Sequence, residues 1–231
     1  MSILDTAIGW VAPPECVVCQ TEGHALCPSC ATDQIIPYGE TCWSCGVKSI
    51  GGRTCPRCRL PGSPTYVWVS TIYDGVASEL LKTFKFNHFR AASNDLAQIM
   101  QDTMLNLDTF EVIQSANYLA VPIPTASSRI RQRSFDHSQL LAEKIAAKLK
   151  IKCMPALGRL GQSRQVGSKR EDRLTQAMGK YYVRLPSLVK QRRILLVDDV
   201  VTTGATLRAA TKVLRDAGAL RVDALVFAKR L

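Results

Sequence analysis

The 231-residue sequence contains no uninterrupted apolar run long enough to cross a membrane, and its first residues lack a secretion signal. A membrane-spanning helix needs about 18 or more predominantly apolar residues. Residues 1–10 have neither a positively charged start nor an apolar stretch followed by a cleavage site. We therefore expect a protein that does not insert into membranes and that works in the cytoplasm.

Acidic residues are scarce relative to basic ones. The sequence has 19 Asp and Glu against 30 Lys and Arg, for a net charge of +11. The excess is uneven, because residues 1–61 hold four basic and five acidic residues, whereas residues 129–193 hold 17 basic and four acidic ones. Such a surplus suits an anionic partner, either a small polyphosphate or a nucleic acid. The alternative is a basic surface that serves solubility alone.

Cysteine is almost absent after residue 60 and concentrated before it, since eight of the nine cysteines form Cys-x-x-Cys pairs in this segment. This pairing is typical of metal sites and not of the disulfides of a secreted scaffold. We expect two structural Zn²⁺ ions in sequential sites, with interleaved sites as the alternative arrangement and an iron–sulfur cluster as the alternative centre. The expected ligands are Cys16, Cys19, Cys27, Cys30, Cys42, Cys45, Cys55 and Cys58.

The cysteine-rich segment has few large apolar side chains, so metal binding must supply much of its folding free energy. A cluster of Pro, Gly and Ser at residues 61–64 ends the segment and indicates a linker. We therefore expect a double zinc ribbon over residues 1–61 and a larger domain over residues 62–231. His24 is not needed as a ligand, and the solitary Cys153 is expected to be a small buried apolar side chain.

The larger domain alternates apolar strands with amphipathic helices. Its last strand, helix and strand form a β-loop-α-β unit, whose two strands should lie parallel through a right-handed crossover. This pattern predicts an α/β fold with a mainly parallel sheet that is covered by helices on both faces. The main expected strands span residues 65–73, 117–122, 194–197 and 222–228, and the main expected helices span residues 93–106, 138–150 and 205–217.

The loop between the last two predicted strands carries Asp-Asp-Val-Val-Thr-Thr-Gly-Ala-Thr at residues 198–206. The strand before it delivers two carboxylates to the carboxyl edge of the sheet, where open α/β sheets bind ligands. Backbone N–H groups, threonine hydroxyls and the helix dipole can cradle one phosphate there, and Gly204 permits close approach. The carboxylates suit ribose hydroxyls, with Mg²⁺ as counter-charge. Two merely solvated carboxylates are the alternative.

This string closely resembles the phosphoribosyl-pyrophosphate motif of type I phosphoribosyltransferases, and it is not a Walker loop because no Gly-Lys-Ser/Thr follows. Over nearly the entire chain, the sequence is also similar to the ComF family of competence-protein and GntX-like phosphoribosyltransferase-like proteins with an N-terminal zinc ribbon. Besides residues 198–204, the resemblance is carried by Tyr73-Asp74-Gly75, Leu81-Lys82, Lys85, Val121-Pro122-Ile123-Pro124, Arg129 to Ser138, Gln165-Val166-Gly167 and Arg173.

The resemblance implies roles for several residues. Val121, Pro122 and the loop after them would bind pyrophosphate, and the charged stretch 162–180 would close over the substrate. The chain departs from the family pattern at residues 133–137, where Arg-Ser-Phe-Asp-His replaces Arg-Gly-Phe-Asn-Gln and changes the geometry expected of the loop. The implied catalytic pair is Asp198 and Asp199, and the implied substrate-binding residues are Thr202, Thr203, Gly204, Ala205, Thr206, Val121, Pro122, Arg129, Arg133, Lys169 and Arg173.

Two functions from different classes follow. The first is a protein that binds phosphoribosyl pyrophosphate or a related nucleotide phosphate with Mg²⁺ and handles single-stranded DNA, with competence-machinery proteins as partners. For DNA, Phe135, Tyr181 and Tyr182 would offer stacking surfaces. The alternative is an active phosphoribosyltransferase in nucleotide metabolism with an unknown acceptor, and whether the chain is an enzyme stays open. His137 is expected to be a cap-region or surface residue, with a general base as the alternative.

Overall fold

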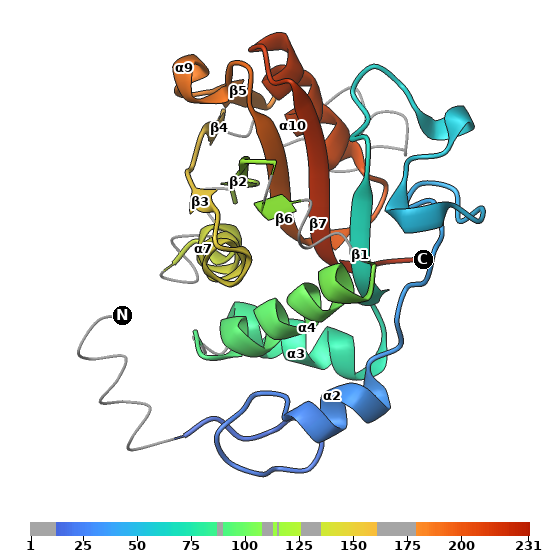
Figure 1. Ribbon diagram of the computed structural model, residues 1–231. Helices are drawn as coiled ribbons and strands as arrows, with labels where there is room; N and C mark the ends of the chain where they lie inside the picture. The colour runs from blue at the N-terminus through green and yellow to red at the C-terminus, as the bar shows by residue number, and fades with distance from the viewer. Residues whose placement is uncertain (1–12, 87–89, 108–112, 115, 126–134, 161–178) are drawn as a thin grey trace.

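A computed structural model describes residues 13–86, 90–107, 113–114, 116–125, 135–160 and 179–231 (Figure 1). Its central sheet has five strands in the order β1-β7-β6-β2-β3. All neighbouring strands in this sheet are parallel, which confirms the expected α/β fold. The strands are β1 (Val67–Ile72), β2 (Tyr118–Pro122), β3 (Lys152–Cys153), β6 (Arg193–Val201) and β7 (Arg221–Lys229).

Helices cover both faces of the sheet, as the apolar pattern of β6 requires. Leu195 and Val197 pack into one core with α3 (Gly75–Phe86), α4 (Ala92–Asn106) and α7 (His137–Leu149). Ile194 and Leu196 alternate with them and pack into a second core with α10 (Ala205–Asp216). Successive side chains of a strand point to opposite faces, so a continuous apolar strand needs a layer on each side.

A small antiparallel sheet lies beside the main one. It pairs β4 (Leu157–Arg159) with β5 (Tyr181–Val183), and the short helix α9 (Pro186–Val189) leads from β5 to β6. Among the described residues, none of the helices has both the length and the apolar character that a membrane crossing requires.

The N-terminal segment covers the outer edge of β1. Its regular elements are short: α2 (Pro28–Gln34) and the 3₁₀ turns η1 (Ile50–Gly52) and η2 (Pro56–Cys58). Pro37 bridges to Thr71, and Arg53 bridges to Tyr66, which immediately precedes β1. Backbone groups on the open edge of a sheet otherwise tend to pair with another chain. The described part of the segment therefore packs against the larger domain, and the boundary at residues 61 and 62 stays a prediction.

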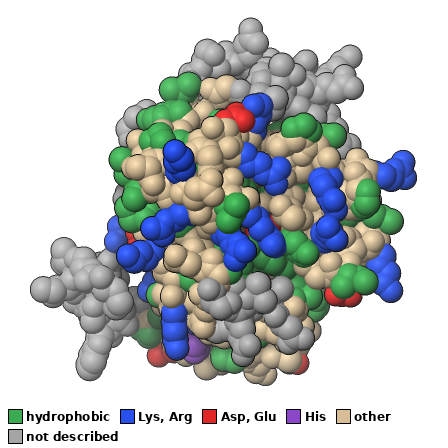
Figure 2. Space-filling view, turned by 45° about the horizontal axis from the view of Figure 1, so that its top comes forward, with side chains coloured by type: hydrophobic (Ala, Val, Ile, Leu, Met, Phe, Trp, Pro, Cys, Tyr) green, Lys and Arg blue, Asp and Glu red, His purple; other side chains and the backbone are tan. Residues whose placement is uncertain are grey.

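The first strand residues of the parallel sheet bring basic side chains together. Arg193 of β6 lies in register with Arg221 of β7, Lys190 and Arg192 come just before β6, and Lys152 begins β3. We call these five residues the amino-end surface. Figure 2 turns this end of the molecule toward the viewer and shows many Lys and Arg side chains with few acidic ones between them.

The strand β6 is longer than the sequence predicted. It continues to Val201, so both aspartates lie within the strand and not in the loop that follows it. Asp198 pairs in register with Val226, and Val201 pairs with Lys229 at the end of β7. The partner strand is equally long, so backbone pairing holds the aspartates extended although their side chains are polar.

Candidate functional site

The eight paired cysteines form two separate groups of four thiols, Cys16–Cys30 and Cys42–Cys58. In each group the ligand atoms all lie within 4.8 Å of one another. The groups follow the order of the sequence, so the interleaved alternative is wrong. Four thiolates close a tetrahedral site and leave no position open for substrate, which fits two structural zinc ions.

The chemistry of the thiols also fits a metal ion. Hydrogen bonding with Thr21 lowers the pKa of Cys19 to about 6, whereas hydrogen bonding with Cys27 raises the pKa of Cys30 to about 12. Thiols this close cannot all ionise by themselves, and a divalent cation removes that penalty because it binds thiolates. His24 stays outside the cluster, as expected, with its Nδ1 atom 3.0 Å from Asp95 Oδ1.

A polar cavity of about 150 Å³ lies at the carboxyl end of β6. Three of the predicted site residues line it, namely Asp198, Asp199 and Thr206. Val121 and Pro122 are buried within β2, and the loop residues directly after them line the cavity. The remaining lining residues come from several elements and are Lys85, Ile123, Pro124, Thr125, His137, Ser138, Arg159, Tyr181 and Val200.

The two adjacent carboxylates have different surroundings. Asp199 Oδ2 lies 2.5 Å from Lys85 Nζ of α3, so its charge is compensated. Asp198 is only 9% exposed, and its Oδ1 accepts a hydrogen bond of 3.0 Å from the Asp199 N–H. Burial, and then the charge of Asp199, raise the pKa of Asp198 to about 8. A divalent cation beside the pair would favour ionisation of both, so the residues fit Mg²⁺.

Two helices begin at this cavity, and their N-termini differ. The first turn of α7 is capped by Asp136, whose Oδ1 accepts from the N–H groups of Ser138 at 3.0 Å and Gln139 at 3.3 Å. The N-cap of α10 is Gly204, which has no side chain to accept a hydrogen bond. The N–H groups and the positive dipole end of α10 therefore suit an external anion better than those of α7.

The structure places the other predicted residues less uniformly. Thr202 is exposed and does not line the cavity, whereas Thr203 is half-buried and its Oγ1 accepts from the Ala205 N–H at 3.4 Å. Gly204 has a φ of +74° and is covered by Trp43. The predicted phosphate ligands Arg129, Arg133, Lys169 and Arg173 lie outside the described residues, so their roles stay predictions.

Sequence reasoning missed several residues that the fold brings to the site. Lys85 contributed only to the family resemblance, and Arg159 lies on β4, which is not among the main strands that the sequence predicted. Trp43 was not singled out, although a large aromatic side chain within a Cys-x-x-Cys pair is a usable signal in a segment with so little apolar bulk. These contacts join residues far apart in the sequence.

His137 was expected to be a cap-region or surface residue. It is the first residue of α7, but it does not lie on the surface. The side chain is 1% exposed, and its ring centroid lies 4.1 Å from that of Phe135 and 4.9 Å from that of Phe84. Two aromatic rings pack against the imidazole, which also borders the polar cavity. Tyr181 is also buried, so of the aromatic residues expected to stack on bases Tyr182 is the most exposed, at 44%.

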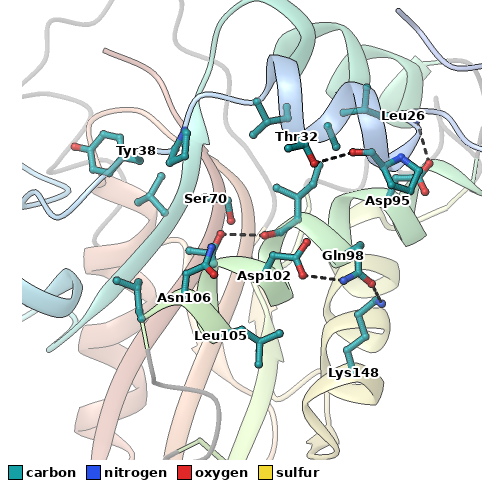
Figure 3. A pocket seen from close by; sticks show the side chains of 18 of the residues that line it. Leu26, Thr32, Tyr38, Ser70, Asp95, Gln98, Asp102, Leu105, Asn106 and Lys148 are labelled. Carbon is teal, nitrogen blue, oxygen red and sulfur yellow. Dashed lines mark hydrogen bonds between the residues drawn. The ribbon is translucent and has the colours of Figure 1, made fainter. Parts of the chain in front are cut away.

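A larger cavity of about 910 Å³ lies away from the carboxylates, between the N-terminal segment and α4 (Figure 3). Several of its polar side chains bind one another. Gln98 Nε2 donates to Asp102 Oδ1 at 2.8 Å, and Lys148 Nζ donates to Gln98 Oε1 at 2.5 Å (Figure 3). A binding site is recognised by polar groups that converge on a ligand and by perturbed pKa values, which favours the smaller cavity.

Comparisons with known proteins agree with this geometry. Residues 136–231 match the family described as the phosphoribosyl transferase domain. The chain is also 25% identical to competence protein F of Haemophilus influenzae over 217 residues, which are 88% of this chain and 91% of that protein. The chain is therefore similar to a competence protein over most of its length, and to phosphoribosyl transferase domains over residues 136–231.

The part that matches the phosphoribosyl transferase domain begins at the N-cap of α7 and includes β6 and α10. The structure of the allosteric regulatory enzyme of purine biosynthesis also matches, at 16% identity and a TM-score of 0.39. That match covers 64% of this chain and 30% of the enzyme.

Proposed function

We propose that the chain binds phosphoribosyl pyrophosphate, or a related nucleotide phosphate, together with Mg²⁺ in the cavity at the end of β6. The observation that carries the proposal is that Asp198, Asp199 and the first turn of α10, whose N-cap Gly204 has no side chain, meet in one cavity. The carboxylates would accept hydrogen bonds from ribose hydroxyls, and the start of α10 would bind the phosphate on the ribose.

The charges of the ligand-free cavity support a role for a cation. Asp198 holds a proton at neutral pH because its pKa lies near 8, and Lys85 compensates Asp199. Mg²⁺ would supply the positive charge that lets both carboxylates ionise, since an opposite charge nearby favours the charged form. Lys85 would then be available to a phosphate oxygen of the ligand.

Thermal-shift measurements with phosphoribosyl pyrophosphate, with and without Mg²⁺, test this proposal. Ligand binding to the folded state should raise the melting temperature. The double variant Asp198→Asn, Asp199→Asn should lose about 1.5–3 kcal/mol for each charge-assisted hydrogen bond, which is more than tenfold in affinity. Asp216→Asn, on the exposed end of α10, is the matched control. Equal binding by wild type and the double variant would contradict the proposal.

We propose in addition that the chain binds single-stranded DNA on its amino-end surface. Parallel strands gather the basic residues Arg192 and Arg193 at one edge, and few acidic side chains lie between the basic ones (Figure 2). A row of cations of this kind tracks a phosphate backbone without reading its sequence. The H. influenzae relative is a competence protein, and this similarity supports a link to DNA and to competence-machinery proteins as partners.

Fluorescence anisotropy with a short thymidine oligomer tests the DNA proposal. Affinity should fall with salt, by about 0.7 in the log–log slope for each phosphate contact on a single strand. Lys190→Ala combined with Arg192→Ala should weaken binding and flatten this slope, whereas Lys82→Ala on α3 should change neither. Salt-independent affinity, or a preference for duplex DNA, would favour the alternative of a phosphoribosyltransferase that acts on small molecules.

A further inference from the structure

Trp43 is held in place within the Cys42–Cys58 group of cysteines. It lies between Cys42 and Cys45 in the sequence, and it is fully buried. Its Nε1 donates a hydrogen bond of 2.9 Å to Thr54 Oγ1, and Thr54 Oγ1 donates one of 2.7 Å to the Pro64 carbonyl. Thr54 directly precedes Cys55, so the orientation of the indole depends on both cysteine pairs of this group.

The indole also packs against the proposed phosphate-binding loop, residues 202–206. A Cβ atom built on Gly204 would lie 2.0 Å from Cζ3 and 2.6 Å from Cη2 of Trp43. Real Cβ atoms do not approach other atoms so closely, so the ring occupies the space that a side chain would take. The loop before α10 therefore rests on Trp43 at the N-cap position itself, where φ is +74°.

A second contact lies one turn further along α10. The Arg208 guanidinium is centred 4.9 Å from the Trp43 ring centroid, and its Nη2 donates to Ser44 Oγ at 2.8 Å. The Arg208 N–H also makes the first hydrogen bond of the helix, to the Gly204 carbonyl at 3.0 Å. The first turn of α10 is thus attached to the Cys-x-x-Cys loop through both an aromatic face and a hydroxyl.

The first group of cysteines has a different docking point. Asp95 of α4 accepts hydrogen bonds from the N–H groups of Ala25 at 2.7 Å and Leu26 at 3.2 Å. Since α4 and α10 cover opposite faces of the sheet, the two groups of cysteines hold opposite faces. The first group therefore serves as an internal control for any effect of metal on the phosphate loop.

We propose that the second four-cysteine site positions the phosphate-binding loop, so that anion affinity at residues 202–206 depends on metal in the Cys42–Cys58 group and not in the Cys16–Cys30 group. Metal fixes the loop that carries Trp43 and Ser44, and these side chains fix Gly204 and Arg208. Trp43 is the positioning residue through which the metal acts. The inference rests on the proposed function for its ligand, but its structural part can be measured without one.

The test compares two exposed cysteines at equivalent places, Cys45→Ser in the second group and Cys19→Ser in the first. Each variant should lose about one zinc ion by metal analysis. Hydrogen exchange of the ligand-free protein should become faster at residues 202–208 in Cys45→Ser and stay as in wild type in Cys19→Ser. Affinity for phosphoribosyl pyrophosphate with Mg²⁺ should fall by about tenfold or more only in Cys45→Ser.

Trp43→Leu separates positioning by the ring from metal binding, because it keeps all eight cysteines and an apolar side chain. It should retain both zinc ions, yet show fast exchange at residues 202–208, and Trp43→Phe should restore most of the protection.

Unchanged exchange at these residues in Cys45→Ser, with its zinc lost, would overturn the inference. Fast exchange across all strands in both Cys45→Ser and Trp43→Leu would also overturn it, because the site would then stabilise the whole domain. If wild type binds no phosphoribosyl pyrophosphate while the exchange pattern holds, the proposed function alone fails.

Discussion

Replacing Asp198 with Asn should change how the stability of the protein depends on pH. Burial raises the pKa of this carboxyl from its ordinary 3.8 to about 8, with a further contribution from the charge of Asp199. Between these values the folded protein keeps a proton that the unfolded chain has released, so the free energy of unfolding falls as pH rises. The slope from one such proton is about 1.4 kcal/mol per pH unit.

Asn cannot ionise, so the variant should escape this loss. Between about pH 5.5 and about pH 7, the variant should gain about 2 kcal/mol relative to wild type. Urea unfolding of the zinc-loaded protein without Mg²⁺ measures the difference at each pH. Asp216→Asn makes the same acid-to-amide change on the exposed end of α10 and should run parallel to wild type. If Asp198→Asn also ran parallel, Asp198 would be ionised throughout this range and the burial argument would be refuted.

Three further outcomes are expected. Metal analysis of the purified protein should find about two zinc ions per chain and no iron chromophore, and a brown iron–sulfur protein would contradict the zinc assignment. Cys153 should react slowly with thiol reagents at neutral pH because burial raises its pKa to about 11, and rapid labelling would show that it is accessible as a thiolate. Tyr118→Phe should lower the free energy of unfolding by about 1–3 kcal/mol, since its hydroxyl donates to the buried Asp223 carboxylate, and a neutral result in urea unfolding would show that Arg221 satisfies Asp223 without it.

The parts of the site that the sequence predicted are the local ones. The apolar run of β6, the two aspartates and the threonines are consecutive, so their spacing places them on one sheet edge whatever the rest of the chain does. The eight cysteines could be predicted for the same reason, because the short Cys-x-x-Cys spacing specifies which two thiols pair. Even there, the pattern left sequential and interleaved ligation open, and the positions of the thiol groups decided between them.

Contacts between distant segments could not be predicted in the same way. Lys85 reaches Asp199 across more than a hundred residues, and Trp43 reaches Gly204 across a longer span. Nothing in the periodicity of α3 reveals which of its polar residues faces the cavity. The prediction for His137 failed for the same reason. A polar residue at a helix start is usually solvated, but here the Phe84 and Phe135 rings cover it.

The pairing of β1 with β7 has a consequence for the order in which the protein can fold during synthesis. The partner of Val67 is Ala224, so β1 leaves the ribosome long before the strand that completes its inner edge. Nascent strands with unpaired edges are prone to associate with other chains. The N-terminal segment is made before β1, is expected to draw much of its folding free energy from metal, and covers the outer edge through Pro37 and Arg53. The segment therefore leaves β1 with only one unpaired edge until translation reaches β7.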